Sequence, residues 1–172
     1  LIPKRTGAPR LIASPKPELR EAQGWVKREI LSKLEPELEA KAFKKETNIK
    51  DNAQIHSGKG LVIRVDLSDF FFSINFPRVR GFFISLGYNP GISTVLALLC
   101  TESDRTKVTY KNEDWFIAQG DRRLPQGACT SPALSNLIAR RLDRRIRNYL
   151  ASMDEEWSYT RYADDLAISH SK

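Results

Sequence analysis

The sequence predicts an α+β fold, in which a small antiparallel sheet is backed by helices. Three stretches carry this prediction. Residues 61–65 form a short β-branched apolar run, 158–169 has the pattern of a β-hairpin, and 131–150 has the periodicity of a long amphipathic helix. A chain of 172 residues is long enough for one sizeable domain, or for two small domains that share a core.

The N-terminal part of the chain contains one clear helix. Residues 1–16 are rich in proline and basic side chains, and we expect a loop or short hairpin there, with 10–14 as its candidate strand. Pro17 favours a helix start, and apolar residues at spacings of three and four extend that helix to about Leu34. Residues 35–60 are polar and poorly periodic, and they include the sequence NAQIH and a Gly-Lys-Gly turn.

The middle of the chain predicts two helices followed by a hairpin. Apolar residues recur at helical spacing over 77–86 and over 92–99, and each run follows a proline that favours a helix start. Gly87 is suited to end the first of these helices. The strand-like runs 107–110 and 115–118 flank the polar sequence KNED, which predicts a β-hairpin.

A long helix is expected to begin at Ser131, which can cap it, with Pro132 at its first position. Its apolar residues are expected to face inward: Leu134, Leu137, Ile138, Leu142, Ile146 and Tyr149. The other face carries arginines that either are solvated or line a nucleic acid backbone: Arg140, Arg141, Arg144, Arg145 and Arg147. After this helix, two strand-like runs predict a hairpin with Asp164 and Asp165 at its tip.

The composition indicates a globular protein that meets a polyanion. Lys and Arg number 28 against 21 acids, which gives a net charge of +7, and 41% of the residues are hydrophobic. Because the protein is basic overall although it holds a tight acidic cluster, its charge indicates that another part of its surface contacts nucleic acid. Charge that serves solubility alone is the alternative.

Membrane and disulfide-rich proteins do not fit this sequence. Its apolar stretches, such as 95–100, are too short to span a bilayer, and no signal-peptide pattern is present, so we expect a cytoplasmic protein. Cys100 and Cys129 lack metal-ligand spacing, and a reduced pair is favoured over a disulfide. The chain begins with Leu1 and stops shortly after an apolar strand, so we expect a fragment.

Three aspartates carry the chemistry that the sequence predicts. Asp66 ends the apolar run 61–65, which we expect to be a buried strand, and Asp164 and Asp165 lie between two strand-like runs. A fold that gathers these carboxylates makes a site of hard oxygen ligands for Mg²⁺ or Mn²⁺. Two such ions can activate a hydroxyl and stabilise the leaving oxygen of a phosphoryl transfer. The alternative for the adjacent pair alone is a solvated turn.

The residues after Asp66 extend this candidate site. The main-chain carbonyl of Leu67 could add a metal ligand. Asp69 either contributes to the site or caps the turn that follows it. Residues 70–72 are three consecutive phenylalanines, and we expect at least one of them to lie in the core.

Three motifs, in this order, resemble the central motifs of reverse transcriptases, and the bacterial retron-type branch is the most similar. They are VDLSDFFFSI at 65–74, LPQGACTSPALSNL at 124–137 and YTRYADDLAIS at 159–169. The segment NAQIH at 52–56 is similar to a short Asn-Ala-x-x-His sequence of that branch. The first 34 residues are similar to its fingers region in the pattern of Gly7, Arg10, Pro15 and Leu19. The resemblance covers essentially the whole chain.

The resemblance implies roles for the acidic residues. Asp66 and Asp164 match the two principal metal-ligating aspartates, and Asp165 matches the second acid of the turn, a less direct participant. Asp69 matches the acid whose backbone lies along the incoming triphosphate.

The resemblance also implies a nucleotide site. Phe71 matches the aromatic residue beneath the sugar, where a bulky ring collides with a 2′-hydroxyl and favours deoxynucleotides. Phe70, next to it, is also expected to contact the substrate. Gln126 matches the glutamine beside the incoming nucleotide, and Gly127 allows close backbone approach. Arg10 matches the fingers arginine that contacts the triphosphate, although a surface charge is its alternative.

The implied fold is a right-hand polymerase with fingers at 1–60 and 76–129 and a palm at 61–75 and 130–172, with the thumb absent. The implied reaction is RNA-directed addition of deoxynucleotides to the 3′-hydroxyl of a DNA or RNA primer, with Mg²⁺ as cofactor and Mn²⁺ as a substitute. The implied partners are an RNA template, a primer, deoxynucleoside triphosphates and, in a retron, a structured non-coding RNA. Without a thumb, the fragment is expected to be weak or inactive alone.

Two other functions stay open at this point. The first is an RNA-dependent RNA polymerase on the same palm, against which Phe71 argues. The second is a palm kept as a nucleic-acid-binding scaffold, against which the presence of all three acids argues. The natural template, the oligomeric state and the setting (retron, phage defence or intron) are not readable from the sequence.

Overall fold

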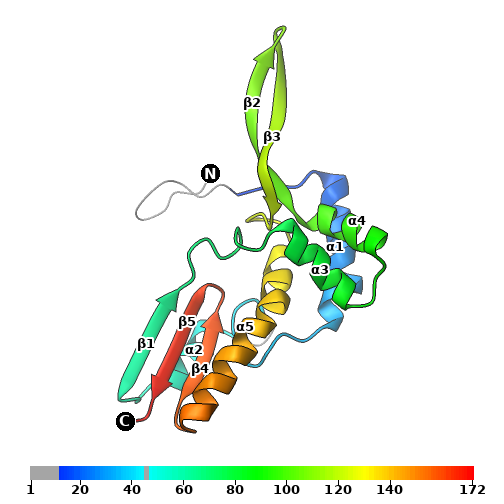
Figure 1. The fold of residues 1–172 in the computed structure, drawn as a ribbon. Coiled ribbons are helices and arrows are strands. Elements are labelled where there is room, and N and C mark those ends of the chain that lie inside the picture. The colour runs from blue at the N-terminus through cyan, green and yellow to red at the C-terminus, as the bar shows by residue number, and fades with distance from the viewer. Residues whose placement is uncertain (1–11, 45–46) are drawn as a thin grey trace. The chain divides into compact units, whose positions relative to one another are not determined.

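The chain folds into two compact units, which we describe from a computed structural model (Figure 1). The structure describes residues 12–44 and 47–172. The first unit comprises Leu1–Arg28 and Phe71–Ser131, and the second comprises Glu29–Phe70 and Pro132–Lys172. The residues from 29 to 60 therefore group with the strand that ends at Asp66. The division into fingers and palm stays a prediction.

The second unit is built on a three-stranded antiparallel sheet with the strand order β1-β5-β4. Its strands are β1 (Leu61–Asp66), β4 (Ser158–Tyr162) and β5 (Asp165–His170). β4 and β5 form the expected hairpin, in which Tyr162 pairs with Asp165. Asp164 therefore lies in the turn, whereas Asp165 is the first residue of β5.

Helices lie on both faces of this sheet (Figure 1). One face packs against α5 (Ser131–Met153), through a cluster that includes Leu150, Tyr159 and Leu166. The other face meets α2 (Ile49–His56), a helix that the polar composition of this region did not predict. The local signal was a capping box. The Asn48 side chain accepts hydrogen bonds from main-chain amides of the first turn, and the Asp51 side chain accepts one from the Asn48 amide.

The inward face of α5 is more polar than expected. Leu134 and Leu137 are buried as predicted, but Leu142 and Tyr149 are 37% and 66% exposed, so their predicted inward position was wrong. Asp143 is fully buried instead. Asp143 binds a buried arginine of β4, described below, so the inward side of α5 includes a charged residue with a partner.

β1 is exposed along its whole length, so the prediction of a buried strand was wrong. Val62 and Val65 are 47% and 44% exposed. Among the described residues, β1 pairs on one side only, with β5, and β-branching alone cannot distinguish an edge strand from a central one. Asp66 is likewise exposed, so the cost of burying its charge does not arise.

The first unit consists of helices and a hairpin. α3 (Phe76–Ser85) and α4 (Pro90–Cys100) begin as predicted, each capped by an asparagine and with proline in the first turn. α1 (Pro17–Glu29) ends earlier than expected, and a short 3₁₀ turn (Leu31–Lys33) follows it. The side-chain amide of Gln23 joins α1 to α4 by donating to the Leu99 carbonyl, over 2.9 Å.

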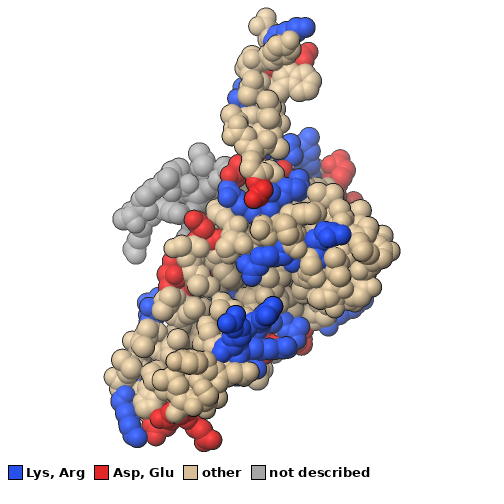
Figure 2. Space-filling view, viewed as in Figure 1, with Lys and Arg blue, Asp and Glu red and all other residues tan. Residues whose placement is uncertain are grey.

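β2 (Glu102–Tyr110) and β3 (Glu113–Arg123) form a longer hairpin than predicted, and they make a sheet of their own. Lys111 and Asn112 form its turn, both with positive φ, which suits the twist of a tight hairpin. The side chains of this hairpin are mostly exposed. In the space-filling view of Figure 2, the hairpin carries both acidic and basic groups among uncharged residues.

The α+β class is therefore confirmed: helices pack with two small antiparallel sheets. The segment 12–16 has no regular structure, so residues 12–14 do not form the strand expected over 10–14, and Arg10 and Leu11 lie outside the described residues. In the described part of the chain, no helix combines the length and apolar character needed to cross a membrane.

Candidate active site

The end of β1 and the β4–β5 turn meet at one end of the sheet. Asp66 lies directly opposite Asp165 in the antiparallel register. One residue further along, the Leu67 amide donates a hydrogen bond to the Asp164 carbonyl over 3.0 Å. The backbone thus brings together three acidic residues from two distant parts of the chain, as the sequence predicted.

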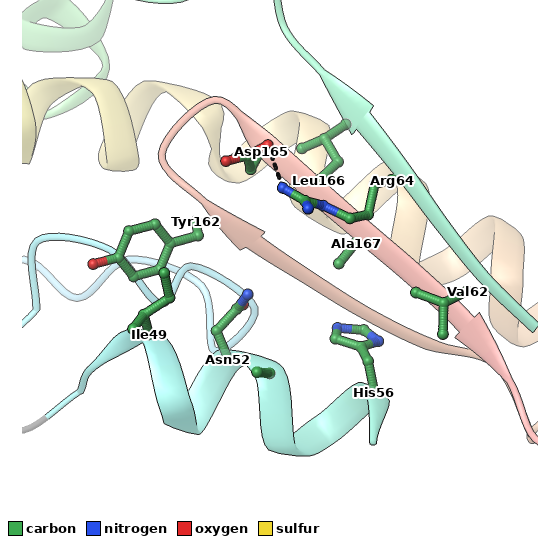
Figure 3. A pocket seen from close by; sticks show the side chains of 10 residues that line it. Ile49, Asn52, His56, Val62, Arg64, Tyr162, Asp165, Leu166 and Ala167 are labelled. Carbon is green, nitrogen blue, oxygen red and sulfur yellow. Dashed lines mark hydrogen bonds and ion pairs between the residues drawn. The ribbon is translucent and has the colours of Figure 1, made fainter. Parts of the chain in front are cut away.

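The side chains of Asp66 and Asp165 share one face of the sheet, because directly opposite residues in an antiparallel pair point the same way. This is the face that α2 covers. Figure 3 shows Arg64 reaching across the same face to Asp165, and their ion pair measures 3.3 Å. Both partners are largely exposed, so this pair contributes little to stability.

The three acidic residues are neighbours, but their side chains do not form a preformed metal-binding site. Within residues 12–44 and 47–172, no group of three or more His, Cys, Asp or Glu side chains is gathered closely enough to hold a metal ion. The donors present are nevertheless hard carboxylate oxygens, which fit Mg²⁺ or Mn²⁺. Arg64 is a competing cation for one of these donors, Asp165.

A pocket of about 310 Å³ lies beside Asp165, between α2 and the sheet. Two polar residues of the NAQIH segment, Asn52 and His56, line it together with Tyr162 (Figure 3). The buried Asn52 Oδ1 accepts no hydrogen bond from the described residues. His56 instead uses both ring nitrogens: Nδ1 is 2.7 Å from Ser169 Oγ, and Nε2 is 2.7 Å from Thr160 Oγ1.

His56 therefore fastens α2 to β4 and β5, the strands that flank the Asp164 turn. Its ring is buried, and burial lowers its pKa below the ordinary value of 6.5, with a smaller contribution from the charge of Lys59. The neutral ring donates to one hydroxyl and accepts from the other. These contacts support a structural role for His56.

The lowered pKa of His56 predicts that the free energy of unfolding decreases as the pH falls below about 6.5. Just below that value the unfolded state takes up a proton that the folded state does not, so stability rises with pH through this range. His56→Gln should weaken this dependence. Thermal unfolding of both proteins between pH 5 and pH 8 measures the difference. Parallel pH profiles would contradict the prediction.

Gln126 and Gly127 lie in the first unit, in the loop before α5, where the segment from Ile12 to Ala13 packs against them. The Ala13 amide donates to the Gln126 carbonyl over 2.7 Å. Gly127 has φ +110°, and a Cβ built on it would lie 2.4 Å from the Ala13 carbonyl oxygen. Gly127 thus allows the close approach of the chain's own residues Ile12 and Ala13, while the expected approach of a nucleotide stays a prediction.

Gly127→Ala is expected to destabilise the first unit by about 1–3 kcal/mol, because the added methyl group overlaps a backbone oxygen at a positive φ. Gly81→Ala is the matched control, since it lies within α3 and a Cβ there has no atom within 4 Å. The control should be neutral or slightly stabilising. Thermal unfolding distinguishes the two, and equal melting temperatures would contradict the steric argument.

The residues between Asp66 and α3 form a succession of turns. Asp69 is exposed and has φ +51°, a conformation that aspartate tolerates better than most residues. Phe70 is buried, and the guanidinium carbon of Arg161 lies 5.6 Å from the centre of its ring. Phe71 is half-buried and belongs to the other unit. Phe70 is therefore a core residue, and its predicted contact with substrate has no support in these contacts.

The arginines of α5 are partly neutralised. Arg140, Arg144 and Arg147 form ion pairs with Glu37, and the Arg144 pair measures 2.7 Å. Arg147 also pairs with Glu39 over 3.0 Å. Burial acts to raise the pKa of Glu37, but the three guanidinium groups bring it below the ordinary value. Figure 2 shows basic side chains gathered over the region of α5. Sequence patterning missed these pairs because the two acids lie about a hundred residues away from the helix.

A fully buried ion pair lies beneath the turn, between Arg161 of β4 and Asp143 of α5. Both side chains have no exposed surface, and Arg161 Nη2 lies 2.7 Å from Asp143 Oδ2. Sequence analysis assigned no role to either residue. The available signal was an aspartate on the expected inward side of an amphipathic helix, where a charge needs a partner.

The family model described as "Reverse transcriptase (RNA-dependent DNA polymerase)" matches residues 2–172. The chain belongs to the reverse transcriptase family. Its relatives include the retron Mx162 reverse transcriptase of Myxococcus xanthus, which is 42% identical over 99% of this chain and 35% of the relative. The retron Ec86 reverse transcriptase of Escherichia coli is 43% identical over 93% of this chain and 44% of the relative.

The predicted resemblance to the retron-type branch is thus confirmed. A third relative, the retron Ec73 reverse transcriptase of Escherichia coli, is 34% identical over 98% of this chain and 51% of the relative. The chain therefore spans between about a third and a half of the length of these curated relatives. The roles of individual residues are not given by these comparisons, and we treat them as proposals below.

Proposed function

We propose that the protein containing this chain is an RNA-directed DNA polymerase that extends a primer 3′-hydroxyl with deoxynucleotides. One observation carries the proposal: Asp66 faces Asp165 across the sheet while the Leu67 amide binds the Asp164 carbonyl. Three acidic residues thus lie at one end of the sheet in a chain of the reverse transcriptase family, which supports the proposal. We propose a right-hand polymerase architecture for the whole protein, with these acids in its palm.

In this proposal, Asp66 and Asp164 hold two divalent cations, Mg²⁺ or Mn²⁺, with Asp165 and the Leu67 carbonyl as further oxygen donors. The chemistry that such ions supply when bound is activation of the primer hydroxyl and stabilisation of the leaving pyrophosphate oxygen. The protein's own contribution is positioning: the register of β1 and β5 sets the spacing of the acids, and Arg64 competes with a cation for one oxygen of Asp165, Oδ1.

The nucleotide contacts are proposed from the family motifs. Gln126 and Asp69 would contact the incoming deoxynucleoside triphosphate, and Gly127 would let the backbone approach it. Arg10 would bind the triphosphate. We propose an RNA template, a DNA or RNA primer and, because the named relatives belong to retrons, a structured non-coding RNA as the natural template.

Primer extension by the full-length protein tests the function. A primer annealed to an RNA template should be extended with deoxynucleotides in Mg²⁺ or Mn²⁺, and excess EDTA should stop the reaction. Ribonucleotide incorporation at equal efficiency would favour an RNA polymerase. Template binding without extension under any of these conditions would favour a binding scaffold. Sequencing the nucleic acid that copurifies with the protein would identify the template.

Phe71→Ala is predicted to relax discrimination against ribonucleotides by roughly tenfold or more, because the ring no longer excludes a 2′-hydroxyl. The measured quantity is the ratio of kcat/KM for a deoxynucleotide to that for the matching ribonucleotide. Phe72→Ala, at the neighbouring ring that stacks against Arg123, is the control and should leave the ratio unchanged. An unaltered ratio in the Phe71 variant would remove the proposed steric gate.

A further inference from the structure

We propose that Arg161 is a positioning residue for polymerisation, which holds the turn that carries Asp164 by binding the main-chain carbonyl of Ala163. This inference rests on the proposed function, because it takes Asp164 and Asp165 as catalytic acids. Arg161 itself touches neither acid in the contacts described, so its effect would be transmitted through the turn.

The turn between β4 and β5 has a strained backbone at Ala163. Ala163 and Asp164 are the two residues between the paired Tyr162 and Asp165, and Ala163 has φ +59°. Glycine is the residue preferred at a position that requires positive φ, because a Cβ makes this conformation costly. A strained backbone of this kind persists only where its surroundings hold it in place. The turn therefore needs a partner that stabilises this conformation.

Arg161 supplies that partner. Its Nη1 donates to the Ala163 carbonyl over 3.1 Å, and the same nitrogen donates to Asn136 Oδ1 over 3.0 Å. Ala163 is itself buried, so its carbonyl has little access to water in place of the guanidinium. The guanidinium thus joins the strained turn to α5.

The orientation of the guanidinium is fixed on its other side. Nε and Nη2 bind the two carboxylate oxygens of Asp143, over 2.8 Å and 2.7 Å, in a bidentate pair. The Tyr159 hydroxyl also donates to Asp143 Oδ1, over 2.9 Å. A planar fork held at two points can place its remaining N–H groups accurately, whereas a lysine ammonium group cannot satisfy all of these acceptors in the same geometry.

Both acids of the hairpin depend on this anchor. The Asp164 carbonyl receives the Leu67 amide, so a shift of the turn also changes the contact with the end of β1. Asp165 follows the turn directly and faces Asp66. Displacement of Ala163 would thus alter the spacing of all three carboxylates, on which charge-neutralising catalysis depends.

The test separates positioning from simple core stability. We replace the buried ion pair and the hydroxyl that binds it, with Arg161→Met, Asp143→Leu and Tyr159→Phe combined in the full-length protein, so that Asn136 and the Ala163 carbonyl lose only their bonds to Arg161. Apolar replacement of a complete buried ion pair is often neutral or stabilising, so the triple variant is expected to fold with a melting temperature near that of the parent. Its kcat for primer extension should fall by about 10–100-fold, the usual loss when a supporting contact is removed, with a smaller change in KM for the deoxynucleotide.

Two controls sharpen this experiment. Tyr159→Phe alone disturbs the same network but keeps the bond to Ala163, so its kcat should equal that of the parent. Adding Ala163→Gly to the triple variant should recover much of the lost kcat, because glycine accepts positive φ without support. A purely structural arginine would not produce this rescue.

The outcomes are distinct. A folded triple variant with a kcat within twofold of the parent overturns the inference. If the triple variant does not fold, Arg161→Lys decides, because it keeps a cation beside Asp143 but loses the fork: a 10-fold or greater loss of kcat supports the proposal, and full activity overturns it. Asp164→Asn is measured in parallel. Activity in that variant would refute the proposed site itself, whereas an inactive Asp164→Asn beside a fully active triple variant refutes only the role of Arg161.

Discussion

Replacing Asp164 by alanine is expected to abolish primer extension by the full-length protein, with a loss of at least about a thousandfold in kcat, while the fold is retained. The proposed chemistry depends on charge neutralisation at this carboxylate, and removal of a single group that acts only on the transition state can cost several orders of magnitude in rate. Stability should change little, because Asp164 is only half-buried and its described hydrogen bond uses the main-chain carbonyl. Extension assays with saturating Mg²⁺, together with thermal unfolding, measure both quantities.

Asp121→Ala is a suitable control for this variant. Asp121 is an exposed aspartate on β3, so its replacement removes the same charge from the protein outside the proposed site. It should leave kcat unchanged. Primer extension at the parental rate by the Asp164 variant would end the assignment of this residue as a catalytic acid.

Asp143→Ala is expected to destabilise the protein by about 3–5 kcal/mol, the largest stability effect that we predict. Removing the carboxylate leaves the guanidinium of Arg161 fully buried without its counter-charge, and it also removes the acceptor of the Tyr159 hydroxyl. Urea unfolding followed by circular dichroism measures the change, provided that the slope with denaturant stays constant.

The combined apolar replacement of Arg161, Asp143 and Tyr159 is the matched comparison. It should recover most of the stability that the single substitution loses, because no charge is then left buried without a partner. Equal destabilisation by the single and the combined substitutions would show that side-chain packing, rather than an uncompensated charge, accounts for the effect.

Local patterns predicted the elements that depend on near neighbours along the chain. Pro77 and Pro90 marked helix starts, and the alternation on either side of Asp164 gave the β4–β5 hairpin. These features follow from backbone conformation over a few residues, so they can be read without knowledge of the fold. The α2 helix carried a similar local signal, the Asn48 capping box, which its polar composition obscured.

Burial was less predictable, because it depends on what packs against an element. The valines of β1 suggested a central strand, but β1 lies at an edge of the sheet in the described structure. Leu142 suggested a core position, but it is 37% exposed, whereas the next residue, Asp143, is fully buried and paired with Arg161. A hydrophobic pattern records the preference of each side chain and does not include the cost of an unpaired charge elsewhere on the same helix.

By itself, the sequence determined the family, the order of the motifs and the three acids of the candidate site, since residue identity and short-range spacing suffice for these. Only the tertiary structure decided that Asp66 faces Asp165, that His56 fastens α2 to the sheet and that Arg161 binds the Ala163 carbonyl. The physical reason is that strand register and buried hydrogen bonds join groups far apart along the chain. Their partners are chosen by the packing of the whole unit, and no local pattern encodes that choice.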